Sequence, residues 1–184
     1  MSTTLFLILC LNGLQYGMLL FLIAAGLTLV FGVMGFINLA HGVQYMVGAY
    51  LVFAYTALTG NFMVAMVLSL GTALLFGLLL EYLIFRHLYA RSHLDQVLAT
   101  FGIIIFLNEL AKVIFGPATL SIAPPEFLSG SVQLTETLRY PTYRLFTILA
   151  GLAVALMLFV TVSYTRIGMR IRVGATTPDM VAAL

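Results

Sequence analysis

The chain has 184 residues, of which 62% are hydrophobic and only 8% are charged, and its mean hydropathy is +1.14. A soluble domain carries roughly 25% charged residues, and a chain of this length cannot bury so much apolar surface in one core. The formal net charge is +2 and the eight basic residues lie in the predicted loops or near the ends of the predicted spans, a distribution that does not indicate nucleic-acid binding. The composition therefore predicts an integral membrane protein.

The first part of the chain is uncharged: residues 1–80 contain no Asp, Glu, Lys or Arg. A bilayer hydrocarbon core takes about 20 apolar residues per helical span, so this stretch suffices for about three spans. Its apolar runs are continuous, whereas strands of a membrane β-barrel alternate polar and apolar residues. We therefore expect an all-α, polytopic bundle of transmembrane helices.

The apolar runs of the whole chain predict about five spans of roughly 20 residues each. They cover approximately residues 5–33, 42–58, 62–85, 92–115 and 141–164. The first two spans are separated by a break in the helical pattern near residues 35–42. The last two are separated by a polar loop at residues 118–140.

Turn and cap signals mark several of these boundaries. Asn61, after Thr59-Gly60, is a candidate helix N-cap. Ser92 and Asp95 fit a start similar to a capping box, and Pro141 suits the first turn of a helix.

The distribution of Lys and Arg predicts the orientation of the spans. Two basic regions, residues 86–91 and 166–172, are separated by two spans and so lie on one side, which we expect to be cytoplasmic. The loop at residues 118–140 then faces outward, as does the turn at residues 59–61.

Three polar residues at the break are candidates for the substrate pathway. Asn38, His41 and Gln44 stand three residues apart, so on a helix they would fall near one face. Broken helices near the midplane are a common way to build transport sites, because freed backbone groups and helix ends can bind a ligand. The alternative is that these side chains only hydrogen-bond to neighbouring helices.

Other polar positions favour packing over transport. Asn12 and Gln15 interrupt the first span and are further candidates for the substrate pathway, with packing as the alternative. Gly13 and Gly17 have the spacing of close helix contacts. Glu109 and Lys112 lie inside the fourth predicted span. Their i,i+3 spacing lets them neutralise each other, so we expect a structural ion pair near the membrane interface.

Several segments resemble one family. The run Ile37-Asn-Leu-Ala-His-Gly42, within residues 26–50, closely resembles the hallmark of branched-chain amino-acid ABC permeases. Glu81-Tyr-Leu-Ile-Phe-Arg-His87 is similar to a further family stretch, with His where Pro is usual. Thr165-Arg-Ile-Gly-Met-Arg170 resembles the exit into the cytoplasmic loop that engages the ATPase.

This resemblance implies a permease subunit that moves branched-chain amino acids across the cell (inner or plasma) membrane of a prokaryote. The partners it implies are a second permease subunit, cytoplasmic ATP-binding subunits, an extracytoplasmic solute-binding protein and the lipid membrane. The chain has no Gly-x-x-x-x-Gly-Lys-Ser/Thr loop for ATP phosphates, so energy would come from separate subunits. No cofactor, metal, nucleic acid or enzymatic activity is expected.

Two other functions remain open. Urea and short-chain amide permeases resemble this family strongly, so the cargo can differ while the architecture stays the same. An ion-coupled secondary transporter is the alternative of another class, but the chain lacks the cluster of intramembrane carboxylates that such carriers commonly need.

The tail predicts the start of a coupling helix. Thr177 can cap a helix that begins at Pro178 and Asp179. The candidates for ATPase coupling are Thr176, Thr177, Pro178, Asp179, Met180 and Leu184. The family usually has Glu or Gln where Thr176 stands. We expect residues 1–184 to form the amino-terminal portion of a single permease domain, with an incomplete cytoplasmic coupling loop at residues 165–184.

Overall fold

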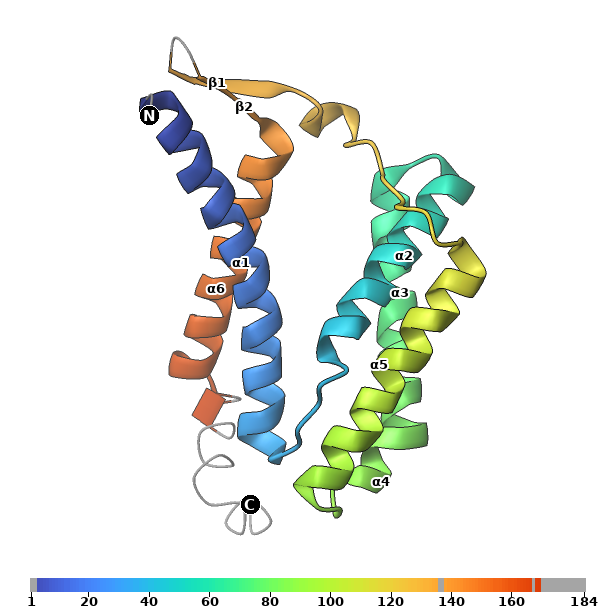
Figure 1. The fold of residues 1–184 in the computed structure, drawn as a ribbon. Helices are drawn as coiled ribbons and strands as arrows, with labels where there is room; N and C mark the ends of the chain where they lie inside the picture. Colours follow the sequence, from blue (N-terminus) through green and yellow to red (C-terminus); the bar gives the residue numbers. More distant parts are fainter. Residues whose placement is uncertain (1–2, 136–137, 167, 170–184) are drawn as a thin grey trace. The chain divides into compact units, whose positions relative to one another are not determined.

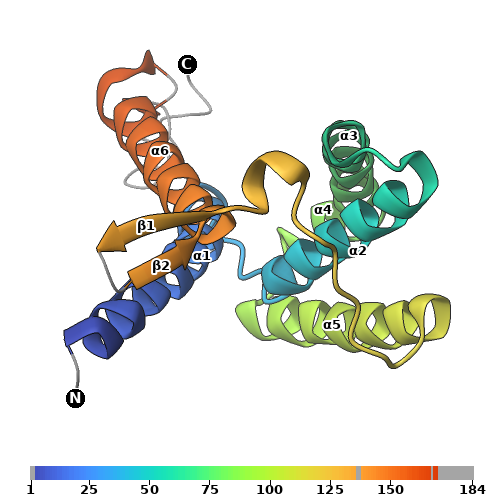
Figure 2. The same ribbon diagram turned by 90° about the horizontal axis from the view of Figure 1, so that it is seen from above.

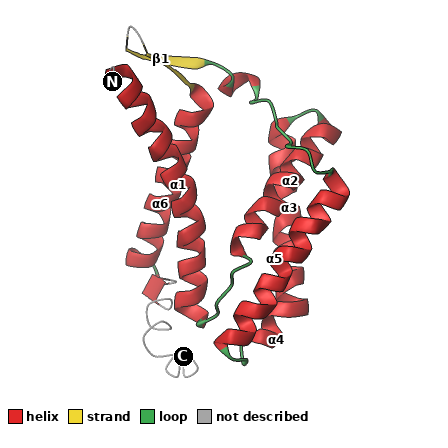
Figure 3. Ribbon diagram, in the orientation of Figure 1, coloured by secondary structure: helices red, strands yellow, loops and turns green. Residues whose placement is uncertain are grey.

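A computed structural model describes residues 3–135, 138–166 and 168–169 of the chain, and helices dominate it (Figure 3). The helical elements are α1 (Thr3–Met34), α2 (His41–Thr59), α3 (Phe62–Leu80), a π-helical turn η1 (Glu81–Phe85), α4 (Arg86–Leu88), α5 (His93–Phe115), a 3-10 turn η2 (Glu126–Leu128) and α6 (Thr142–Tyr164). The two strands are β1 (Ser131–Thr135) and β2 (Leu138–Pro141).

Four described segments are long and apolar enough to cross a membrane, and they confirm a polytopic all-α membrane protein. These segments are Thr4–Gly32, Phe62–Leu88, His93–Phe115 and Thr142–Tyr164. Helix α2 occupies the remaining predicted span with 19 residues, but His41 and Gln44 in its first turn make it less apolar than the others. Four of the five predicted spans are therefore confirmed by length and composition.

The predicted caps of α3 and α5 are present. Asn61 Oδ1 accepts hydrogen bonds from the backbone N–H groups of Met63 at 2.9 Å and Val64 at 3.2 Å. Ser92 Oγ accepts one from the N–H of Asp95 at 3.2 Å. These side chains satisfy N–H groups that a helix start leaves unpaired, which explains why both helices begin where the sequence predicted.

The polar loop predicted after α5 contains a short hairpin that the sequence analysis did not predict. Strands β1 and β2 pair in antiparallel fashion. Leu138 and Tyr140 are each 2% exposed, while Arg139 between them is exposed. This alternation is that of a strand with one packed face. Pro141 is the N-cap of α6 rather than a residue of its first turn.

The chain divides into two compact units, one formed by Met1–Gly26 with Ala123–Leu184 and the other by Leu27–Ile122. In the first unit, α1 and α6 lie side by side (Figures 1 and 2). A Cβ atom added to Gly151 of α6 would lie 2.9 Å from Cβ of Met18 on α1, so only glycine fits there. Gly13 and Gly17 face open space within the described chain, so the close approach in this unit is made by Gly151 instead.

The second unit packs α2, α3 and α5 around one apolar core. The buried members of this core are Phe36, Ala40, Val43, Leu80, Phe85, Ile103 and Leu107. Phe36 and Ala40 come from the segment that joins α1 to α2, so an irregular stretch of backbone lies at the centre of the packing.

Candidate functional site

The segment between α1 and α2, residues 35–40, is not helical, and we call it the break segment. Gly35 has φ +62°, a conformation that favours glycine, and it ends α1. The burial of the next residues alternates: Leu39 is 42% exposed and Ile37 is half-buried, between buried neighbours. The buried side chains of the segment are those of Phe36, Asn38 and Ala40. The predicted helix break is therefore confirmed, as a non-helical segment with one packed face.

Two side chains of α5 bind the backbone of the break segment. The N–H of Ile37 donates to Gln96 Oε1 at 3.0 Å, and the N–H of Leu39 donates to Thr100 Oγ1 at 3.3 Å. Gln96 is 2% exposed and Thr100 is fully buried. Backbone N–H groups that leave a helix need other partners when they are removed from water, and α5 supplies them.

Gln96 also connects the break segment to the turn before α5. Its Nε2 donates to the carbonyl groups of Leu88 at 3.2 Å and Arg91 at 3.3 Å. Both ends of the side-chain amide are therefore used, one on the break segment and the other on the turn. Thr100 Oγ1 donates in turn to the carbonyl of Gln96 at 2.7 Å, so the two α5 residues form one buried polar network.

Phe36 fixes the same segment through ring packing. Its ring centroid lies 5.4 Å from that of Phe85 and 5.1 Å from that of Tyr89, the latter in an edge-on arrangement. The hydroxyl of Tyr89 donates to the carboxylate of Glu81 in η1. Burial and this carboxylate raise the pKa of Tyr89, so the phenol stays protonated and remains a donor. The π-helical turn η1 thus lies against the break, and such turns are frequent at functional sites.

A cavity of about 350 Å³ lies along the other face of the break segment. We call it the break cavity, and it is lined by Leu27, Thr28, Phe31, Ile37 and Leu39. Non-helical backbone is tolerated at membrane depth where it is buried in protein or lines a cavity. The break segment does both, with its packed face against the core and its other face along this cavity.

The three polar residues predicted at the break occupy different environments. Asn38 is 5% exposed on the packed face, and its Oδ1 has no hydrogen-bond partner among the residues that the structure describes. His41 and Gln44 are half-buried in the first turn of α2. The prediction that all three share a helical face is wrong for Asn38, because α2 begins only at His41. Their place in a substrate pathway stays a prediction.

Asn12 joins the two long helices of the first unit. Its Oδ1 accepts hydrogen bonds from the hydroxyl of Tyr140 at 3.0 Å and from Nη1 of Arg144 at 2.7 Å. This contact supports the packing interpretation for Asn12. Gln15, one turn further along α1, is half-buried.

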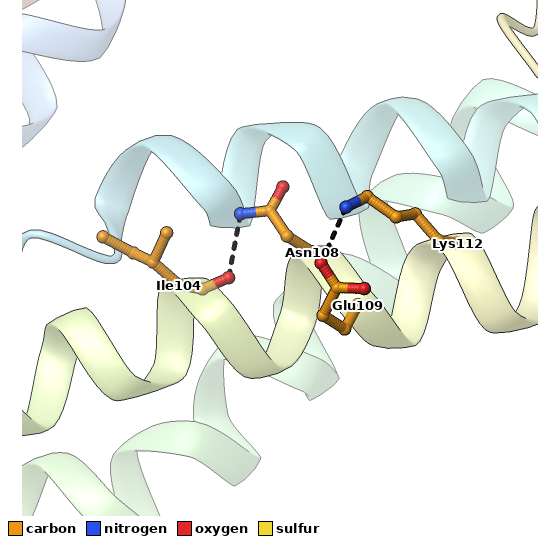
Figure 4. Close-up of polar contacts among 4 residues, drawn as sticks. All are labelled: Ile104, Asn108, Glu109 and Lys112. Carbon is orange, nitrogen blue, oxygen red and sulfur yellow. Dashed lines mark hydrogen bonds and ion pairs between the residues drawn. The ribbon is translucent and has the colours of Figure 1, made fainter. Parts of the chain in front are cut away.

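The Glu109–Lys112 ion pair predicted from its spacing is confirmed. Lys112 Nζ lies 2.6 Å from Glu109 Oε1, and the two side chains are 57% and 62% exposed, respectively (Figure 4). The amide of Asn108 donates to the carbonyl of Ile104 at 2.8 Å on the adjacent turn.

Sequence reasoning missed Gln96 and Thr100. The signal that could have found them is the i,i+4 spacing of two uncharged polar residues in an apolar helix, which puts both on one face. The candidates for ATPase coupling, by contrast, cannot be placed. Thr176, Thr177, Pro178, Asp179, Met180 and Leu184 lie outside the described residues.

Comparison with known proteins gives consistent matches. Residues 9–184 match the family model described as branched-chain amino acid transport system / permease component. The high-affinity branched-chain amino acid transport system permease protein BraD of Pseudomonas aeruginosa is 30% identical over 135 residues, which cover 68% of this chain and 43% of BraD. The corresponding protein LivH of Escherichia coli is 28% identical over 190 residues, which cover 94% of this chain and 60% of LivH.

A third relative, LivH of Salmonella typhimurium, is 26% identical over 194 residues, again 94% of this chain and 60% of the relative. The chain thus spans about half the length of the curated relatives it matches. No solved structure gives a significant match. The family model covers nearly the whole chain, and the broken, multi-span helical fold agrees with a transport permease. This chain therefore belongs to the family of branched-chain amino-acid transport permeases.

Proposed function

We propose that the chain acts as a membrane permease of an ABC importer that moves branched-chain amino acids into the cell. The names of its relatives support this cargo. Since the sequence lacks a phosphate-binding loop of the Gly-x-x-x-x-Gly-Lys-Ser/Thr type, separate ATP-binding subunits supply the energy. A second permease subunit and an extracytoplasmic solute-binding protein complete the importer.

The observation that carries the proposal is the break segment, fixed on one face and lining a cavity on the other. Gln96 and Thr100 hold its backbone, while Ile37 and Leu39 present apolar side chains to the break cavity. An apolar wall suits an aliphatic side chain. Irregular backbone between two helices also offers a place where a change of conformation can open the path to either side in turn.

The polar residues take different roles in this proposal. His41 and Gln44, which begin α2 directly after the break segment, are the pathway candidates with partly exposed side chains. Asn38 remains a candidate because its buried Oδ1 has no hydrogen-bond partner among the described residues, which leaves it available to a polar group of a ligand. Asn12, bonded to β2 and α6, orients α1 instead, and Gln15 is the weaker pathway candidate of the first span.

Uptake of labelled leucine by cells that express this permease together with its partner subunits tests the proposal. We expect uptake that requires ATP, survives dissipation of ion gradients, and is displaced by isoleucine and valine. Uptake of urea or acetamide in place of leucine would overturn the cargo. Loss of uptake when ion gradients are dissipated, with ATP still present, would overturn the energy source.

A substitution in the break cavity tests the site itself. Leu39→Trp places a larger ring where Leu39 lines the cavity, and we expect leucine uptake to fall roughly tenfold or more, since each 1.4 kcal/mol added to the barrier costs that factor. The matched control is Leu98→Trp, because Leu98 is 70% exposed on α5 and does not line the break cavity. Equal uptake by the two variants, at equal amounts of assembled complex, would contradict the site.

A further inference from the structure

A second cavity, of about 490 Å³, lies at the carboxyl end of α5. We call it the α5-end cavity. Helix α2 contributes Met46, Ala49, Tyr50 and Phe53 to its lining, and α5 contributes Lys112. Most of residues 116–122 form the remaining wall. By the predicted orientation this end of α5 faces outward, toward the side on which a binding protein delivers cargo.

The aromatic residues that line this cavity, Tyr50 and Phe53, both pack against Phe115. The ring of Tyr50 stacks on that of Phe115 with centroids 4.6 Å apart, and Phe53 packs edge-on against the same ring at 6.4 Å. Gly116 has φ +83° and ends α5, so the chain turns there and passes along the cavity. The volume lies in the range of small-molecule sites, and an apolar lining with few polar groups is typical of them.

Lys112 is the charged residue among those that line the cavity. Glu109 does not line it, but its Oε1 lies 2.6 Å from Lys112 Nζ, and Figure 4 shows the ammonium group directed at that carboxylate. Both side chains are more than half exposed, so a ligand can reach them. Charged groups on a membrane helix are costly to place and are functional candidates for that reason.

We infer that the α5-end cavity binds a zwitterionic α-amino acid with an aliphatic side chain. The carboxylate of the ligand binds the ammonium group of Lys112, and its ammonium group binds the carboxylate of Glu109. Its side chain packs on the wall formed by Tyr50 and Phe53. This inference deepens the proposed function and rests on it, since it names a site for the amino-acid cargo.

The number of ion pairs formed on binding favours a zwitterionic ligand. Binding replaces one ion pair by two, so neither protein charge loses its partner. A ligand with only one charge would bind only one of the two groups and leave the other without its partner, so it gains less than a zwitterion. Neutral urea or an amide gains little from either group, so the charge pair favours amino acids over those cargoes.

A double variant separates this role from a purely structural ion pair. Glu109→Gln and Lys112→Gln should each lower leucine uptake about tenfold or more at unchanged complex assembly, since tenfold corresponds to 1.4 kcal/mol. If the pair were only structural, the double variant would recover, because no unpaired charge would remain. A binding site predicts that the double variant is as impaired as either single one. Glu126→Gln, which neutralises an exposed carboxylate outside the cavity, is the matched control.

Ligand protection of an engineered cysteine tests binding without transport. Thr119→Cys, placed in the lining of the cavity in a Cys10→Ala background, is labelled with a water-soluble maleimide in the assembled complex. We expect saturating L-leucine to slow labelling, leucinamide and 4-methylpentanoate to slow it less, and urea to have no effect. The protection should disappear in the Glu109→Gln/Lys112→Gln variant.

The outcomes separate the inference from the proposed function. A complex that imports leucine, yet shows no protection or equal protection by all four compounds, overturns the α5-end site and leaves the importer standing. Recovery of uptake in the double variant overturns the site as well. A correctly assembled wild-type complex that imports urea but not leucine overturns the proposed cargo, and the site inferred for it falls too.

Discussion

The two ends of α5 carry polar groups in opposite settings. Near its amino end, Gln96 and Thr100 are 2% and 0% exposed, and both accept hydrogen bonds from the backbone of the break segment. Near its carboxyl end, Glu109 and Lys112 are more than half exposed and bind each other. The buried residues are uncharged and the exposed ones are charged, as the cost of burying an ion requires.

We expect the amino end of α5 to contribute to the stability of the fold and its carboxyl end to contribute to ligand binding. A buried amide that holds irregular backbone is costly to remove, because its partners stay buried and lose their hydrogen bonds. An exposed ion pair contributes little to stability and can exchange its partners for those of a ligand. Substitutions at the amino end of α5 should therefore affect folding, whereas substitutions at its carboxyl end should affect transport.

The largest expected effect is at Phe36, which anchors the break segment next to Gln96. Phe36→Ala removes a ring that is 1% exposed between Phe85 and Tyr89, and Phe→Ala changes in a core cost about 3–5 kcal/mol. Thermal unfolding of the purified permease subunit, followed by circular dichroism, should show the loss. The control Phe106→Ala removes a ring that is 63% exposed on α5 and should unfold close to wild type. Equal unfolding of the two variants would mean that the break segment is not anchored by this ring.

The next effect is at Gln96. Gln96→Leu leaves the N–H of Ile37 and the carbonyls of Leu88 and Arg91 without this partner, and a buried group left unsatisfied costs about 1–3 kcal/mol. Gln96→Glu can still accept from Ile37, but its buried carboxylate cannot donate to the two carbonyls and carries the cost of a buried charge, so it should unfold at least as readily as Gln96→Leu. If Gln96→Leu unfolds like wild type, the amide network does not support the break.

Much of this fold could be predicted because its signals are local. Continuous apolar runs located the spans, and single residues such as Asn61 and Ser92 marked helix starts by satisfying their own first turn. The break was visible as well, from glycine and polar residues within an apolar stretch. Each of these features depends on neighbours in the sequence.

The bonds that hold the break could not be predicted in the same way. Ile37 and Gln96 are 59 positions apart, and Leu39 and Thr100 are 61 apart, so tertiary packing alone brings them together. Asn38 was assigned to a helical face because its spacing fits one, but the backbone there is not helical, since α2 begins only at His41. The β1–β2 hairpin was missed because its period-2 pattern covers only a few residues.

The N-cap of α3 should give an effect on stability that is smaller than that at Gln96 and larger than that at Glu109. Asn61→Ala removes the side chain that accepts from Met63 and Val64, and loss of such a cap costs typically about 1 kcal/mol. Asn61→Asp, which keeps an acceptor, should stay near wild type in the same unfolding experiment. A loss as large as that of Phe36→Ala would show that the turn at residues 59–61 does more than start α3.

The smallest expected effect on folding is at Glu109. Its carboxylate is paired with Lys112 but more than half exposed, so Glu109→Gln should cost less than about 1 kcal/mol of unfolding free energy. If the two ends of α5 have different roles, Glu109→Gln should keep nearly wild-type stability but clearly lose leucine uptake. Gln96→Leu should lose both stability and uptake. Lys112→Arg, which keeps the charge, is the matched control and should keep most of the uptake. If Glu109→Gln instead unfolds as readily as Gln96→Leu, the pair is part of the folded framework, and the two ends of α5 serve the same purpose.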